Sequence, residues 1–337
     1  MNANAMEADY FTEGALVGVL TAEPLDRVLD YRAPEGGCGI GAFVEVPLGP
    51  RRVIGVVWGR GQGGYDPAKI RRIANVVDVA PMRPEMRQFL ERAAQYTFTP
   101  LSAMLRLATR APALGASPQA RRLYTRGATT PARMTDARAR VMDVIDEYGG
   151  AALSQTELAQ AAGVSSAVIK GLVEQGALAQ VEAPRDAPFP ALDHHLEGKN
   201  LSPDQADISR RLRHKIAAGG FGASLLKGVT GSGKTEVYLE AVAEALAKGQ
   251  QALVLLPEIA LSAEFLTRVE ARFGARPAEW HSGITMAERR RVWKMVGEGA
   301  AQLVVGARSS LFLPFRDLGL IVVDEEHDTS YKQEDGV

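Results

Sequence analysis

The spacing of apolar and polar residues changes along the chain, and the first part has the spacing of strands. Short runs rich in β-branched residues are separated by Gly, Pro and Asp, and they predict strands at 15–20, 41–49, 51–59 and 72–80. Residues 83–108 then have the spacing of an amphipathic helix, interrupted at Pro100. We therefore expect a small β-rich domain with terminal helices at 1–108.

The middle of the chain has two segments without a sustained period, 109–135 and 184–200, and both are expected to be linkers. Between them lie a predicted helix from residue 136 to paired glycines, a helix that begins at Ser154 with Glu157 completing a capping box, a helix at 165–175 and a strand at 178–183. Three helices and a β-wing are typical of a winged helix-turn-helix domain, here at 136–183.

From residue 201 onwards, strand-like and helix-like patterns alternate. Continuous apolar runs predict strands at 223–229, 252–257, 301–307 and 319–326, with helices at 234–248, 261–273 and 286–298. Buried strands separated by helices indicate a parallel sheet covered on both faces, at 201–337. The predicted fold class is multidomain α/β, with a β-rich domain, a winged helix and a parallel-sheet lobe.

Composition narrows the class of protein. The 337 residues are 46% hydrophobic and 23% charged, with a net charge of −1, so any nucleic-acid surface must be local. The one cysteine, Cys38, excludes an internal disulfide framework and a cysteine-based zinc site in this chain. Since there is no secretory signal and no apolar run of the roughly 20 residues that span a bilayer, we expect a cytoplasmic protein without a membrane partner.

The stretch GVTGSGKT matches G-x-x-x-x-G-K-[ST] between a predicted strand and a predicted helix. Its glycines let the backbone wrap a phosphate, and the helix N-terminus supplies N–H groups. We expect Lys234 to contact the β- and γ-phosphates of ATP and the Thr235 hydroxyl to bind Mg²⁺. The candidate ATP-binding residues are Gly228, Val229, Thr230, Gly231, Ser232, Gly233, Lys234 and Thr235.

The stretch IVVDEEH ends a later apolar strand. We expect Asp324 to hold Mg²⁺, largely through water, Glu325 to orient and deprotonate the attacking water, and His327 to sense the γ-phosphate. Taken alone, an acidic run at a strand end is equally a solvated surface. Together with the phosphate loop it predicts an ATP hydrolysis site with catalytic residues Lys234, Asp324, Glu325 and His327.

Other predicted strands also end in polar loops. LLPEIALS, HSG and GARSSLFLPF lie at the carboxyl edge of the predicted sheet, where open α/β sheets bind ligands. Such loops suit tracking of a nucleic-acid backbone, and the candidate contacts are Glu258, Arg308 and Ser309. Each loop alone is also compatible with an ordinary connection. A small-molecule kinase would need a lid and a substrate pocket, which the sequence does not indicate.

In this order, GVTGSGKTEVYLEA, LVLLPEIALS, HSG, GARSSLFLPF and LGLIVVDEEHDTSYKQE resemble motifs I, Ia, Ib and II of superfamily 2 DEAD/DEAH helicases. More narrowly they resemble the PriA family. The resemblance implies a RecA-like lobe in a monomeric, ATP- and Mg²⁺-dependent 3′-to-5′ DNA helicase that recognises stalled or branched forks in the bacterial nucleoid and promotes primosome assembly. It also implies single-strand-binding protein and other primosome proteins as partners, and zinc in the full-length family without ligands in this chain.

The N-terminal part resembles the family's FDY…P…VPFG pattern, here Leu29-Asp30-Tyr31, Pro34 and Val46 to Gly49. This implies a domain that binds 3′ DNA ends, with Asp30, Tyr31 and Gly49 forming a pocket and Arg71 contacting phosphate. A core position for Tyr31 and a simple turn at Gly49 stay open as the alternative. Leu29 stands where the family usually has Phe, which puts aromatic packing on the terminal nucleotide in doubt.

Two further positions are open to more than one interpretation. Gln205 resembles the glutamine that reads adenine in helicases. The expected recognition helix carries only Lys170 as a cation, so duplex binding and a protein contact are both compatible with it.

The chain ends shortly after motif II, in a stretch that resembles the start of the family's aromatic-rich loop. We therefore expect it to be the N-terminal portion of a longer protein. The alternative function is that the truncated chain acts only as a module that binds DNA 3′ ends or forks without unwinding.

Overall fold

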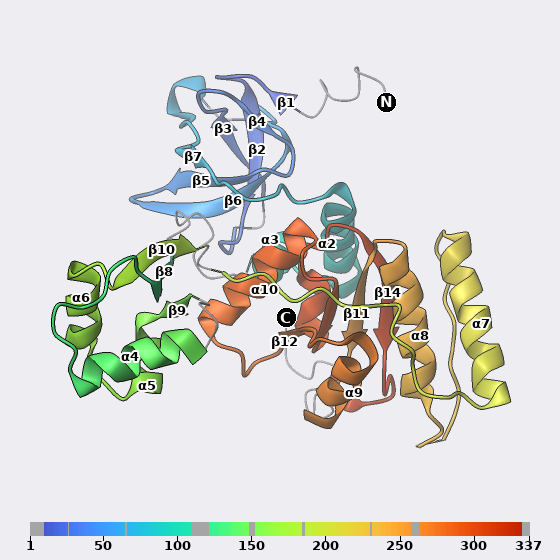
Figure 1. Ribbon diagram of the computed structural model, residues 1–337. Helices are drawn as coiled ribbons and strands as arrows, with labels where there is room; N and C mark the ends of the chain where they lie inside the picture. Colours follow the sequence, from blue (N-terminus) through green and yellow to red (C-terminus); the bar gives the residue numbers. More distant parts are fainter. Residues whose placement is uncertain are drawn as a thin grey trace. The chain divides into compact units, whose positions relative to one another are not determined.

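The computed structural model describes residues 10–25, 27–64, 66–109, 121–147, 152–183, 186–229, 231–257 and 263–331. The chain divides into two compact units, Met1–Gly115 with Pro188–Val337, and Ala116–Ala187. The predicted fold class, multidomain α/β, is confirmed. Each unit is described by itself below, with the element labels of Figure 1.

The N-terminal part of the first unit is an antiparallel sheet in the order β3-β2-β6-β5-β7, beside a two-stranded sheet β1-β4. The strands are β1 (Tyr10–Phe11), β2 (Leu16–Thr21), β3 (Leu29–Arg32), β4 (Cys38–Gly39), β5 (Phe43–Leu48), β6 (Arg51–Arg60) and β7 (Asn75–Val76). The predicted strands at 15–20, 41–49 and 51–59 are confirmed. Of 72–80, only Asn75–Val76 is a strand. The strands β1, β3 and β4 were missed.

Two helices follow the sheet, α2 (Pro84–Thr97) and α3 (Leu101–Ala108). The chain breaks between them as predicted, with Pro100 as the N-cap of α3. A proline cannot continue a helix through its ring, but it tolerates the start of one, because the N–H it lacks would be unpaired there anyway.

The N-terminal sheet, α2, α3 and the lobe share one apolar core. The ring of Phe43 meets the edge of Trp293 at 5.6 Å between centroids, and Trp293 Nε1 donates to the Ala108 carbonyl at 3.0 Å. Trp58 Nε1 donates to Glu91 Oε1 of α2 at 2.8 Å. Trp293 is only 5% exposed, so its indole fixes the N-terminal sheet and α3 against the helix that carries it.

The lobe contains a parallel sheet in the order β12-β13-β11-β14. Its strands are β11 (Gln251–Leu255), β12 (Ala278–Trp280), β13 (Leu303–Gly306) and β14 (Leu318–Val323), and its helices are α8 (Lys234–Ala247), α9 (Ala263–Phe273) and α10 (Met286–Glu298). Leu253 and Leu255 pack with α10, whereas Ala252 and Val254 pack with α8 and α9. Alternate residues of β11 therefore face opposite helical layers, as predicted for a parallel sheet buried on both faces.

The strand predicted at 223–229 is wrong. The described residues 221–229 form no strand, and Leu225 and Val229 are 71% and 79% exposed. An apolar run becomes a strand only where a neighbouring edge accepts its backbone hydrogen bonds. In this segment, the Ser224 hydroxyl instead accepts a hydrogen bond from Lys215 Nζ of a helix, at 3.0 Å. The outer residues of β14, Ile321 and Val323, are correspondingly half-exposed.

The second unit has an antiparallel sheet in the order β10-β8-β9 and a helical core. Its elements are β8 (Arg121–Arg126), α4 (Asp136–Glu147), β9 (Leu153–Ser154), α5 (Gln155–Ala162), α6 (Ser166–Glu174) and β10 (Leu178–Ala183). The capping box is confirmed: Glu157 N donates to Ser154 Oγ and Ser154 N to Glu157 Oε2. The linker prediction for 109–135 is wrong at 121–126, because β8 pairs along all of β10. The other domain boundaries stay predictions.

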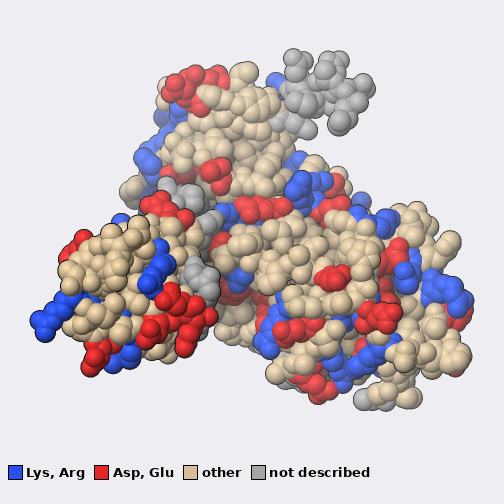
Figure 2. All heavy atoms as spheres, viewed as in Figure 1, with Lys and Arg blue, Asp and Glu red and all other residues tan. Residues whose placement is uncertain are grey.

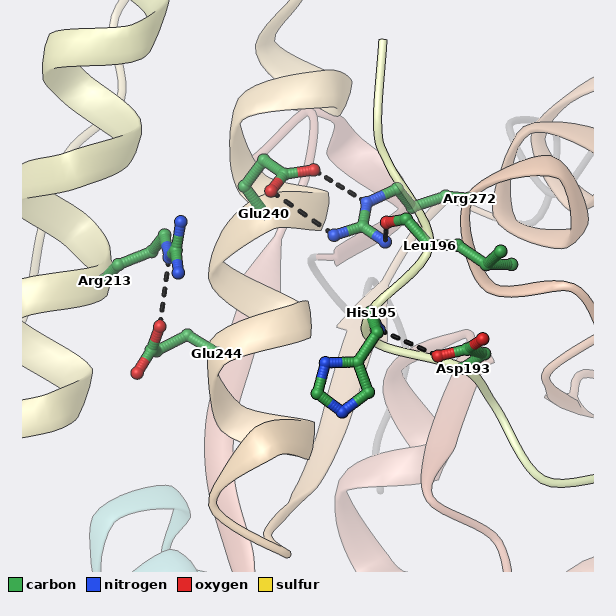
Figure 3. A network of polar contacts seen from close by, with 7 residues as sticks. All are labelled: Asp193, His195, Leu196, Arg213, Glu240, Glu244 and Arg272. Carbon is green, nitrogen blue, oxygen red and sulfur yellow. Dashed lines mark hydrogen bonds and ion pairs between the residues drawn. The ribbon is translucent and has the colours of Figure 1, made fainter.

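Helix α7 (Pro203–Ala218) lies beside α8, and ion pairs hold this side of the lobe together. Figure 3 shows Arg213 of α7 bonded to Glu244 of α8 at 3.0 Å. On the other side of α8, the buried Arg272 of α9 bonds both oxygens of Glu240 and donates to the Leu196 carbonyl. Ion pairs on both sides of α8 thus join it to α7 and α9.

The turn into α8 depends on Gly233. Its φ of +77° lies in the left-handed region, and a Cβ there would overlap Nε2 of Gln205. That same Nε2 donates to the Ser232 carbonyl at 2.9 Å, while Gln205 Oε1 accepts from Ser202 N in a second capping box. The absence of a side chain at Gly233 therefore lets α7 bond the loop that precedes α8.

We expect Gly233→Ala to lower the free energy of unfolding by about 2 kcal/mol, about 1 for the left-handed backbone and about 1 for the lost Gln205 bond. The matched control is Gly249→Ala, at φ +72° with nothing within 4 Å, which should cost only the first of these. Urea unfolding followed by tryptophan fluorescence measures both, because Trp58, Trp280 and Trp293 all lie in the first unit. Equal losses in the two variants would refute the Gln205 contact.

We expect Trp293→Ala to destabilise the first unit by about 3–5 kcal/mol, because it removes a buried indole and leaves a cavity between the N-terminal sheet and α10. Met286→Ala, on the same helix at a residue 62% exposed, should change stability by no more than about 0.5 kcal/mol. The measurement is urea unfolding followed by the fluorescence of Trp58 and Trp280. A Trp293 variant as stable as the Met286 variant would show that the shared core does not join these elements.

Candidate functional site

The phosphate loop closes on itself in front of α8. Lys234 Nζ donates to the carbonyls of Gly228 at 2.9 Å and Val229 at 3.3 Å, and Ser232 N donates to the Val229 carbonyl at 3.1 Å. Gly231 and Gly233 both have φ near +78°. The ammonium group thus lies inside the loop at the N-terminus of a helix, where anionic oxygens are favoured. Thr230 lies outside the described residues.

Asp324 directly follows β14 and is held at both carboxylate oxygens. The Tyr238 hydroxyl donates to Oδ2 at 2.9 Å, and Glu325 N donates to Oδ1 at 2.9 Å. Asp324 N continues the ladder to the Leu255 carbonyl of β11 at 3.0 Å. Since Tyr238 lies one helical turn after Lys234, the phosphate loop and Asp324 are at the same end of the sheet.

Two tyrosines that the sequence reasoning missed surround this aspartate. Burial, and secondarily the Asp324 carboxylate, raise the pKa of Tyr238, so its hydroxyl remains a donor. Tyr331 donates its hydroxyl to the Asp324 carbonyl at 2.9 Å, and burial with the carboxylates of Asp324, Asp328 and Glu325 raises its pKa too. Helical spacing could have found Tyr238, four residues after Lys234. No local signal points to the Tyr331 contact.

Glu325 and His327 lie on the exposed side of the same loop. Glu325 has a φ of +48°, which is uncommon for a residue other than glycine. Its Oε2 lies 3.5 Å from His327 Nε2, and the His327 side chain is 76% exposed. A left-handed backbone at a predicted catalytic carboxylate is the kind of strain that functional sites carry. Both roles stay predictions.

The donor set fits a magnesium nucleotide. Thr235 follows Lys234 in the first turn of α8, and Tyr238 of the next turn bonds Asp324, so a hydroxyl and a carboxylate lie near Lys234. Mg²⁺ is commonly held by one or two such groups, water and the substrate phosphates, without a protein cage. Among the residues that the structure describes, no three His, Cys, Asp or Glu side chains gather as metal ligands. Lys234, Thr235 and Asp324 would therefore hold the bound nucleotide and its metal.

The remaining strand ends bring other predicted residues to the same edge. Trp280 Nε1, at the end of β12, donates to Ser309 Oγ at 3.1 Å, and the guanidinium of Arg289 lies 4.8 Å from the centre of the Trp280 ring. Arg308 Nη1 donates to the Tyr331 carbonyl at 3.1 Å. Arg308 and Ser309 are thus fixed near the loop that carries Asp324. Glu258 lies outside the described residues, and the DNA contacts stay predictions.

Gln205 reaches the phosphate loop, but its amide is already used on both sides by Ser232 and Ser202. Reading of adenine by Gln205 therefore stays a prediction.

The predicted DNA-end residues divide into two places on the N-terminal sheet. Tyr31 is 5% exposed within the core, and its hydroxyl donates to the Pro47 carbonyl at 3.1 Å. Burial raises its pKa, with Arg71 acting in the opposite direction. Tyr31 thus has the core position that was the alternative for it, and its part in a pocket for a DNA end stays a prediction.

Gly49 and Arg71 lie together beside Tyr31, since Arg71 Nη1 donates to the Gly49 carbonyl at 3.0 Å. Gly49 has φ +60° in the β5–β6 hairpin, with open space where a Cβ would be. Asp30 instead accepts the N–H groups of Gln62 at 3.0 Å and Gly63 at 2.7 Å. The structure therefore brings Gly49 and Arg71 together, and records no bond between them and Asp30.

On the face drawn in Figure 2, basic and acidic side chains are interspersed, in keeping with a net charge of −1. Of the helices that the structure describes, none is long and apolar enough to cross a bilayer.

Two family models match the chain. The 3'DNA-binding domain (3'BD) of PriA matches residues 18–110, and the DEAD/DEAH box helicase domain matches residues 202–337. The first covers the N-terminal sheet with α2 and α3, and the second covers the lobe with the phosphate loop and Asp324.

Several relatives resemble the chain over most of its length. It is 29% identical to the replication restart protein PriA of Bacillus subtilis over 94% of this chain and 49% of that protein. It is 31% identical to the protein of the same name from Chlamydia pneumoniae over 94% of this chain and 44% of that protein. A Rickettsia conorii protein of this name is 43% identical over 49% of this chain and 26% of its own.

The chain thus spans about half the length of the relatives that it matches over most of its own length. The two family models match in this order along the chain, and the relatives that match it over most of its length are named replication restart protein PriA. The chain belongs to the PriA family.

Proposed function

We propose that the chain supplies the DNA-end-binding domain and the ATP-binding lobe of an ATP-dependent 3′-to-5′ DNA helicase for replication restart. The matches to a 3'DNA-binding domain and a DEAD/DEAH box helicase domain support this function, as do relatives named replication restart protein PriA. In this role the protein recognises stalled or branched forks in the bacterial nucleoid. It acts as a monomer with single-strand-binding protein and other primosome proteins.

The observation that carries the proposal is the bond from Tyr238 to Asp324, which joins the first turns of α8 to the end of β14. ATP hydrolysis in this class of site needs a phosphate-binding lysine and a metal-binding carboxylate within reach of one nucleotide. If Asp324 lay at the opposite edge of the sheet from Lys234, ATP hydrolysis at this site would be impossible.

Each residue then has a defined part in hydrolysis. Lys234, which bonds the Gly228 and Val229 carbonyls, would neutralise the β- and γ-phosphate oxygens of ATP, and Thr235 and Asp324 would hold the metal. Glu325 orients the attacking water and takes its proton, and His327 senses the γ-phosphate. Bound Mg²⁺ supplies charge neutralisation at the transferring phosphoryl group.

A second candidate is a module that binds DNA 3′ ends without unwinding. It is favoured by the conformation of the phosphate loop, because Lys234 bonds the carbonyl of Gly228 in the same loop and the preceding residues 221–227 are not part of the sheet. In this case the chain binds DNA ends, ATP binds weakly, and the binding of ATP does not change the binding of DNA.

Lys234→Ala separates nucleotide from DNA binding. We expect loss of binding of a fluorescent ATP analogue by more than about tenfold, because the main cation of the phosphate site is removed, with 3′-end DNA binding changed less than about twofold. The matched control is Lys248→Ala at the far end of α8, whose ammonium bonds the Ile216 and Ala217 carbonyls and which should preserve both. Equal loss of nucleotide and DNA binding would refute separate sites.

Arg71→Ala tests the DNA end. We expect weaker binding of a partial duplex with a recessed 3′ end, and a slope of log K against log salt smaller by about 1, because one phosphate contact is lost. Fluorescence anisotropy at several salt concentrations measures both. Arg72→Ala is the control, because its guanidinium pairs with Glu13 at 2.9 Å. An unchanged salt slope for the Arg71 variant, or the same change in both variants, would contradict the contact.

A further inference from the structure

Tyr238 links the helix that carries one predicted magnesium ligand to the carboxylate of the other. Its hydroxyl donates to Asp324 Oδ2 at 2.9 Å, and Thr235 lies three residues earlier on the same helix. Its ring is 5% exposed and packs in the apolar cluster that contains Leu239 and Val242. The hydroxyl thus projects from an apolar core toward a single carboxylate.

Without this bond, the Asp324 carboxylate would be held by one contact only, from Glu325 N to Oδ1. The torsion about Cβ–Cγ is broad and soft for a carboxylate, so a single bond leaves the whole planar group a range of rotation. The Tyr238 hydroxyl fixes Oδ2, and with it the plane of the carboxylate relative to α8. Because α8 also carries Thr235, one bond sets the carboxylate relative to the hydroxyl.

We propose that Tyr238 is a positioning residue for magnesium, which orients the Asp324 carboxylate toward an ion shared with Thr235 of the same helix. The inference rests on the proposed function, since it concerns the same nucleotide site. Side chains that orient metal ligands typically change metal affinity by about 10–100-fold when they are removed. A hydroxyl with only a role in folding would leave the magnesium requirement of nucleotide binding unchanged.

Tyr238→Phe tests the inference, because it deletes the hydroxyl and keeps the ring in its core. The measurement is binding of a fluorescent ATP analogue to the purified chain while Mg²⁺ is titrated, together with binding of the same analogue in EDTA. We expect the variant to need about tenfold more Mg²⁺ for half-maximal binding. Binding in EDTA should change less than about twofold, because the lysine and the loop that hold the phosphates are intact.

Two comparisons isolate the effect. Tyr124→Phe removes the hydroxyl of a tyrosine that is 7% exposed in the second unit, where it accepts a bond from Gln180, and it should leave the Mg²⁺ midpoint unchanged. In an Asp324→Asn background, Tyr238→Phe should shift the midpoint by less than about twofold, because two residues that act through one contact are not additive.

The outcomes separate this inference from the proposed function. If the unaltered chain bound the analogue without any response to Mg²⁺, the proposed nucleotide site would fail. If the unaltered chain responded to Mg²⁺ and Tyr238→Phe kept its midpoint, or lost binding equally in EDTA, the positioning role would be overturned while the nucleotide site stood. A tenfold shift that persists in the Asp324→Asn background would also overturn it.

Discussion

The bond between Tyr238 and Asp324 is the constraint on which the nucleotide site depends. Parallel strands bring their carboxyl ends to one edge, but the edge alone does not set the distance from a helix to a strand end. The hydroxyl of α8 meets the carboxylate after β14 at 2.9 Å, and the ladder from Asp324 N to Leu255 ties that carboxylate to the central strand β11. The helix that follows the phosphate loop and the Asp324 carboxylate are therefore coupled through one buried side chain.

A second constraint joins the lobe to the N-terminal sheet. Trp293 belongs to the helix that covers one face of the parallel sheet, yet its indole packs on Phe43 and bonds the end of α3. Trp293 thus packs in the apolar core that the N-terminal sheet and the lobe share. It joins the two parts of the first unit that would hold a DNA end and a nucleotide. Sequence patterns do not reveal such sharing, because each element looks amphipathic whichever partner it buries against.

The sequence predicted local features of the fold, such as helices and caps, but not which strands pair with one another. The helices at 234–247 and 286–298, the break at Pro100 and the capping box at Ser154 follow from periodicity and cap chemistry that act within a few residues. The strand expected at 223–229 and the missed β8 both depend on which edge is available, which a run of apolar side chains does not encode. In the candidate site, motif spacing predicted Lys234 and Asp324, and the structure places both at one end of the sheet. The contacts of Tyr238 and Tyr331 with Asp324 needed the fold.

The burial of Tyr31 changes how a DNA end would be recognised. With no ring face available there, and Leu29 where the family usually has Phe, the predicted pocket is left with hydrogen-bonding groups and a cation. The Asp30 carboxylate accepts two backbone N–H groups, and a carboxylate has about four lone-pair sites, so acceptors remain for a 3′ hydroxyl. Arg71, held at Gly49, offers its remaining donors to phosphate. Recognition by these groups would select a hydroxyl end whatever the terminal base.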